Sequence, residues 1–163
     1  MRTTKIILAL TILVASLQFT GCKKYEEGPF ISLRTKTARL IGEWNLVNYN
    51  ETYNSPDSSL TKTYDGKTIT QTTKNQTCSF DYTQHLIFKK DNTYSLTPDN
   101  DPRFGIINDQ SYPWSFSSNK EDLVLNDINY NILRLTEKEL IIEAHTKKDN
   151  WTHDTRWEYK KQD

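Results

Sequence analysis

The residue types that most often carry catalysis are present, but their spacing does not build a catalytic site. No Gly-x-Ser-x-Gly motif and no glycine-rich phosphate loop occurs in the sequence. Glu143 and Asp154 could form an acid/base pair, but an exposed cross-strand contact relieved by Arg156 accounts for them more simply. The histidines lack the local spacing of metal ligands; they are His85, His145 and His153. We therefore expect no catalysis, no metal and no other cofactor.

Covalent chemistry is instead indicated at Cys22. A start with two basic residues precedes residues 6–17, an almost purely apolar run. This run is too short to span a bilayer, which needs about 20 apolar residues. Together with the segment Phe19-Thr20-Gly21-Cys22, it resembles the signal of bacterial lipoproteins, although Phe19 stands where an aliphatic residue is usual. The resemblance implies cleavage before Cys22 and a lipid on its thiol. An ordinary secretory signal is the alternative.

These features divide the chain into a signal peptide, residues 1–21, a lipid-anchored tether, residues 22–37, and one domain, residues 38–163. With Cys22 lipidated, Cys78 has no intramolecular partner, because the sequence holds two cysteines. The formal net charge is zero. Without a basic excess, nucleic acid is not expected as a partner.

The domain has the pattern of antiparallel β-structure. Residues 80–88 alternate strictly between an apolar and a polar face, and a turn ending at Asn92 leads into the next strand. A two-residue Asn126-Asp127 turn joins another hairpin. Changes of phase near residues 47 and 133 indicate β-bulges.

The faces of the last hairpin follow from the alternation of side chains along its two strands. Its inward row contains Leu140 and Trp157, which we expect to pair, and its outward row contains Glu143, His145 and Asp154. Sequential hairpins with one apolar face each predict an all-β fold, an antiparallel up-and-down barrel of 8–9 strands. A β-sandwich is the alternative.

Several short motifs resemble those of lipocalin-like lipoproteins of Bacteroidetes-type bacteria. Gly42-Glu43-Trp44 matches the Gly-x-Trp that opens the first lipocalin strand, and residues 88–94 match a typical hairpin, with Asn92 in place of the usual glycine. The resemblance implies a lipocalin-like barrel whose closed end is plugged by Trp44. It also implies a basic residue of the last strand stacked over this ring, with Arg156 as the first candidate and Lys160 as the second.

The barrel interior is the remaining candidate for function. A mixed aromatic and polar lining suits a small, partly apolar ligand, whereas side chains that simply fill the barrel are the alternative. The expected lining residues are Tyr82, Gln84, Tyr112, Trp114, Tyr130, His153 and Thr155.

The expected partners are a membrane, through lipid on Cys22, and either a small hydrophobic ligand or another envelope protein. The anchor implies the outer membrane. The charged segment that follows Cys22, residues 23–27, resembles a cell-surface export signal, so both the periplasmic face and the cell surface stay open.

Overall fold

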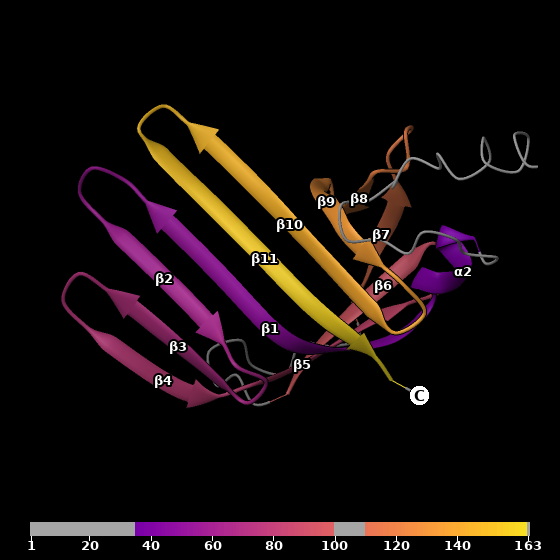
Figure 1. The fold of residues 1–163 in the computed structure, drawn as a ribbon, viewed down its shortest axis with the longest axis horizontal. Helices are drawn as coiled ribbons and strands as arrows, with labels where there is room; N and C mark the ends of the chain where they lie inside the picture. The colour runs from indigo at the N-terminus through magenta and orange to yellow at the C-terminus, as the bar shows by residue number, and fades with distance from the viewer. Residues whose placement is uncertain (1–34, 100–109, 163) are drawn as a thin grey trace, which may run out of the picture.

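The computed structural model describes residues 35–99 and 110–162 (Figure 1). The predicted signal peptide, Cys22 and nearly all of the tether lie outside these residues. No helix in the described ranges is long and apolar enough to cross a membrane. The elements are α2 (Lys36–Leu40), β1 (Gly42–Asn54), β2 (Ser59–Tyr64), β3 (Thr68–Thr73), β4 (Thr77–Asp81), β5 (Thr83–Phe88), β6 (Thr93–Asp99), β7 (Ser111–Phe116), β8 (Asp122–Leu125), β9 (Ile128–Leu135), β10 (Glu139–Lys148) and β11 (Trp151–Lys161).

Eight of the strands form a closed antiparallel barrel. Around it they run β1, β5, β6, β7, β8, β9, β10 and β11, and β11 pairs again with β1. The closing ladder is long, from Trp44 opposite Lys161 to Asn54 opposite Thr152. Because first and last strands pair, these eight strands bury one apolar face without leaving an open edge between them. The predicted barrel is confirmed, and the sandwich is excluded.

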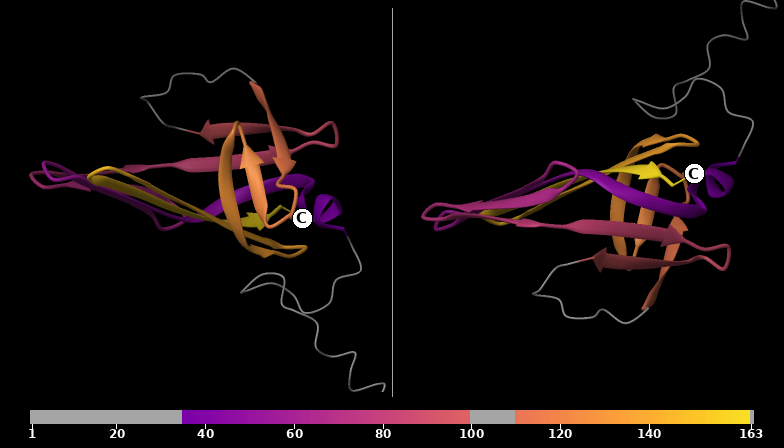
Figure 2. Two further views of the ribbon diagram at one scale, coloured as in Figure 1. Left: turned by 90° about the horizontal axis from the view of Figure 1, so that it is seen from above. Right: turned by 90° about the horizontal axis from the view of Figure 1, so that it is seen from below.

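Three further strands, β2, β3 and β4, lie outside the closed barrel. On one edge of β1, residues 42–45 pair with β5, whereas residues 49–54 pair with β2. The far halves of β1, β10 and β11 therefore continue with β2–β4 as a six-stranded sheet that projects from the barrel (Figures 1 and 2). We call this sheet the extension. The closed barrel has eight strands, as expected, and three more lie outside it, because a thirteen-residue β1 serves two partners in succession.

Local turn and bulge predictions hold. Asn92 has a φ of 63°, and Asn126 and Asp127 have φ values of 47° and 66°. Left-handed positions of this kind suit Asn and Asp, whose side chains tolerate them better than most. The register of β1 against β11 shifts between Leu46 and Asn48, which is the bulge expected near residue 47. Residue 133 is skipped where β9 pairs with β10, as expected.

The last hairpin has the predicted parity but a different register. Leu140 pairs with Tyr159, and Trp157 pairs with Ile142 instead. The shift of two residues follows from the turn, which lies at residues 149–150 with Asp149 at a φ of 50°. Asp149 and Asn150 suit the backbone conformation of this two-residue turn better than a pair that includes Lys148 would. Since the shift is even, the inward and outward faces are unchanged.

Helix α2 and Trp44 occupy one end of the barrel. Leu40 and Trp44 are fully buried, and the Trp44 indole N–H donates to the Leu40 carbonyl at 2.7 Å. Thr35 caps the helix start by accepting from the Ala38 amide. The short helix therefore depends on tertiary contacts at this end of the barrel.

The cation over Trp44 is Lys161, so the prediction of Arg156 is wrong, as is that of Lys160. Lys161 Nζ lies 4.9 Å from the Trp44 ring centroid and donates to the carbonyls of Arg39 and Ile41 at 2.6 Å each. Arg156 lies on the outer face opposite Glu143 and donates to Glu158. Lys161 takes the position because it stands directly opposite Trp44 in the closing ladder.

Replacing Lys161 by Met should lower the free energy of unfolding by about 2–3 kcal/mol, because two charged hydrogen bonds and a cation–π contact are lost while the apolar stem stays. Urea denaturation followed by circular dichroism measures the change. Lys160→Met is the matched control, since Lys160 is exposed. Equal stability of the two variants would contradict the assigned role of Lys161.

Candidate ligand-binding cavity

The barrel interior contains a cavity of about 200 Å³. Typical small-molecule pockets measure about 300–1,000 Å³, so this one suits a ligand smaller than a drug molecule. The interior is thus not completely filled by side chains. The cavity is lined by Gln84, Leu86, Tyr94, Leu96, Tyr112, Leu125, Tyr130, Ile142, Trp157 and Tyr159.

Three of the seven expected lining residues, Gln84, Tyr112 and Tyr130, lie on this cavity. Tyr82 is not among the lining residues, and its hydroxyl donates to Gln84 Oε1 at 3.3 Å. Trp114 is part of the barrel core at 5% exposure. Its ring packs edge-on against Phe88 at 5.8 Å, and it is not among the lining residues.

His153 and Thr155 lie farther along β11, in the extension. His153 Nε2 is 2.8 Å from Glu51 Oε1, and Thr155 pairs with Glu51 in the ladder. Both residues belong to the face that continues the barrel interior, as alternation predicts. The cavity does not extend to these two residues, because their part of β11 lies beyond the end of the closed barrel (Figure 1).

Seven lining residues were absent from the expected set. Each nevertheless stands in an inward row that the sequence shows, such as the row of β10 and β11. Alternation identifies an inward side chain but does not say at which height of the barrel it lies. The seven are Leu86, Tyr94, Leu96, Leu125, Ile142, Trp157 and Tyr159.

The phenol groups of Tyr94, Tyr130 and Tyr159 stay protonated near neutral pH. Burial, with smaller contributions from Tyr130 and Tyr112, raises the pKa of Tyr94 to about 12. Burial also raises the pKa of Tyr130 and raises that of Tyr159 well above its usual value. No Asp, Glu, Lys, Arg or His is among the lining residues. The cavity wall is therefore uncharged and offers hydroxyl groups as hydrogen-bond donors or acceptors.

Charge is concentrated instead at Glu51 on the inner face of the extension. Its carboxylate accepts from the Tyr49 hydroxyl at 2.5 Å and pairs with Lys62 at 2.7 Å and His153 at 2.8 Å. Burial disfavours the charged form, but these three partners outweigh it and lower the pKa of Glu51. Tyr49 in turn packs on Trp157 with ring centroids 4.0 Å apart, which connects the charged group to the cavity wall.

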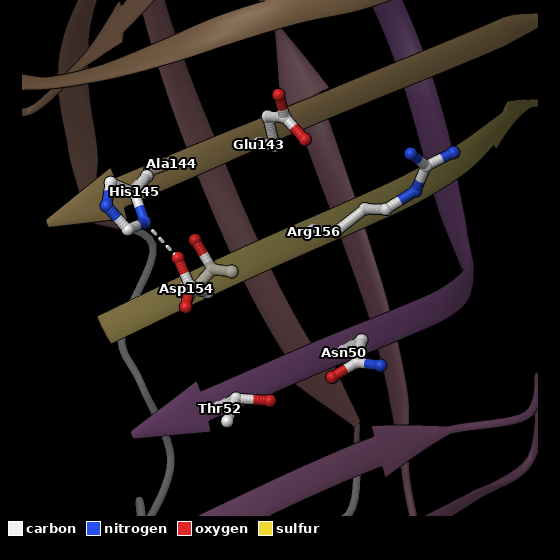
Figure 3. Close-up of a pocket in the computed structure, with 8 residues that line it drawn as sticks. Asn50, Thr52, Glu143, Ala144, His145, Asp154 and Arg156 are labelled. Carbon is white, nitrogen blue, oxygen red and sulfur yellow. Dashed lines mark hydrogen bonds and ion pairs between the residues drawn. The ribbon is translucent and has the colours of Figure 1, made fainter. Parts of the chain in front are cut away.

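A second, shallower hollow of about 440 Å³ lies on the outer face of β1, β10 and β11 (Figure 3). His145 Nδ1 contacts Asp154 across β10 and β11, and Glu143 stands opposite Arg156. Both members of the His145–Asp154 pair are at least half exposed. The expected contact between Glu143 and Asp154 is therefore replaced by a solvent-exposed cross-strand contact between Asp154 and His145, and Arg156 donates to Glu158 instead. Solvent screens interactions on this face.

The three histidines lie in separate places. His85 Nδ1 is 2.6 Å from Asn45 Oδ1, whereas His145 and His153 contact different carboxylates on opposite faces of the sheet. Within the described ranges, no three His, Cys, Asp or Glu side chains come together as a metal site would require.

Comparison of the chain with known protein families and with curated proteins finds no match.

The pKa of Glu51 predicts a pH-dependent contribution to stability. A carboxyl group whose pKa is lowered by folding stabilises the fold above its usual pKa of 4.5, and this contribution is lost as pH falls through the lower, folded-state pKa. Glu51→Gln should therefore cost about 1–3 kcal/mol at neutral pH and progressively less in acid. Thermal unfolding at a series of pH values measures the difference. Glu121 is an exposed carboxylate, so Glu121→Gln is the control. The prediction would be contradicted if the difference in stability between the wild type and Glu51→Gln did not change with pH.

Proposed function

We propose that this protein is a non-enzymatic, lipid-anchored lipoprotein of the cell envelope whose barrel binds a small, partly apolar ligand. The observation that carries the proposal is the cavity of about 200 Å³, in which aliphatic and aromatic walls surround a few hydrogen-bonding groups. Such a combination is typical of small-molecule sites. The resemblance of the Gly42-to-Trp44 motif to lipocalins supports the same function.

The anchor and the location are proposed from the sequence. The signal that ends at Cys22 supports attachment to the outer membrane, on its periplasmic face or at the cell surface. A tether of polar residues would then separate the barrel from the lipid.

An alternative role is a structural or interaction module of the envelope. The small cavity and the projecting extension favour it, since β2–β4 add a surface that closing the barrel does not require. Residues 54–65 of the extension would take part in such contacts. Residues 98–109 would supply a second contact segment, and nearly all of them fall outside the described ranges.

Native mass spectrometry of the purified protein tests ligand binding. We expect a retained small molecule in the wild type and its loss in Leu96→Trp, because the larger side chain would occupy the cavity. Ile128→Trp is the control, since Ile128 is 53% exposed. Binding that survives Leu96→Trp would place the ligand elsewhere, and the absence of any bound molecule would favour the alternative role.

Cys22→Ser tests the anchor. Without the thiol no lipid can be attached, so the protein should move from the membrane pellet to the soluble fraction. Cys78→Ser should stay in the pellet, because Cys78 is an exposed residue of β4 in the folded domain. Retention of Cys22→Ser in the pellet would refute the anchor.

A further inference from the structure

The geometry of the cavity points to a ligand class: an uncharged ring compound that presents hydrogen-bond acceptors. This inference rests on the proposed ligand-binding function and adds the chemistry that the ligand must have.

Four polar groups on the cavity wall have no hydrogen-bond partner among the described residues. The indole N–H of Trp157 is buried and unpaired. The hydroxyls of Tyr94, Tyr130 and Tyr159 make no hydrogen bond within residues 35–99 and 110–162 either, and all four residues line the cavity. None of the three hydroxyls is closed off from solvent, so the contents of the cavity can supply their hydrogen-bond partners.

The unpaired hydroxyls suit a ligand that carries acceptors. A phenol hydroxyl donates as readily as it accepts, so each of the three can donate to such a ligand, whereas the Trp157 nitrogen is not accessible to solvent and would meet a ligand only after its ring moves. The hydroxyls of Tyr94, Tyr130 and Tyr159 are close enough to interact, since Tyr130 and Tyr94 each help to raise the pKa of Tyr159. A carbonyl or ring-oxygen acceptor placed between them could use two donors at once.

The wall also disfavours a charged ligand. With no charged side chain among the lining residues, an ion would lose its hydration without gaining a counterion. The nearest carboxylate described above, Glu51, is already held by Tyr49, Lys62 and His153.

Size and shape favour rings. Half of the lining residues are aromatic, and the Trp157 and Tyr159 rings lie nearly parallel, at an interplanar angle of 7°. The remaining apolar wall is formed by Leu86, Leu96, Leu125 and Ile142. A cavity of about 200 Å³ suits a compound of one or two rings.

A matched set of probes tests the inference on the purified full-length protein. The bicyclic ketone 1-tetralone carries one carbonyl acceptor, tetralin has the same rings without it, and tetralin-1-carboxylate adds a charge. Isothermal titration calorimetry measures the three affinities. We expect 1-tetralone to bind and the carboxylate to bind at least about tenfold more weakly, because its charge has no partner.

Four substitutions each remove one donor while keeping an aromatic ring: Trp157→Phe, Tyr94→Phe, Tyr130→Phe and Tyr159→Phe. At least one should weaken 1-tetralone about three- to tenfold while leaving tetralin unchanged, since only the ketone loses a hydrogen bond. Tyr53→Phe is the control, because Tyr53 lies in the extension and packs against Trp151. Near-ultraviolet circular dichroism verifies that each variant is folded, and the loss of one variant leaves the other three.

The outcomes separate this inference from the proposed function. If the ratio of the 1-tetralone and tetralin affinities is the same in the wild type and all folded variants, the acceptor requirement is wrong although the cavity still binds apolar rings. Carboxylate binding as tight as that of the ketone overturns the requirement for an uncharged ligand. If none of the three probes binds while native mass spectrometry retains a molecule, the ligand class is wrong. If no probe binds and native mass spectrometry finds no retained molecule, the proposed function is wrong as well.

Discussion

The whole architecture depends on the pairing of the first strand with the last. β1 and β11 close the barrel, and their ladder brings Lys161 opposite Trp44. There one ammonium group contacts the Trp44 ring and binds two carbonyls at the end of α2, so a single side chain joins helix, first strand and last strand. Gly42 is needed at the same place. Its φ of 131° disfavours other residues, and a Cβ there would lie 2.7 Å from Lys161 Cε.

The length of β1 explains why the molecule is more than a barrel. Its first residues pair with β5 and complete the closed wall, whereas its far half turns to β2. The bulge between Leu46 and Asn48 separates these two parts. Because β10 and β11 are also long, the inner face of the barrel continues as one face of an open sheet (Figure 2). A partly apolar interior therefore leads directly into a more polar surface.

This continuity separates two kinds of electrostatic environment along a single sheet. Inside the barrel the polar groups are neutral phenols, an indole and an amide. Beyond the packed rings of Tyr49 and Trp157, the carboxylate of Glu51 forms an ion pair with Lys62 and contacts His153. Burial keeps the first group neutral, and ion pairing keeps the second charged, so a ligand in the cavity meets hydrogen-bonding groups and apolar walls but no fixed charge.

Local sequence determined much of this protein: the strands, their inward and outward faces, the left-handed turn residues at Asn92 and Asn126, and both bulges. These features follow from side-chain alternation and from backbone preferences within a few residues, which the sequence shows directly. Only the tertiary structure decided which cation covers Trp44, where β1 changes partners, and which inward residues meet around the cavity. Those outcomes depend on register between distant strands. A shift of two residues preserves every face and therefore leaves no trace in the alternation, yet it moves Trp157 from Leu140 to Ile142 and so changes its neighbours inside the barrel.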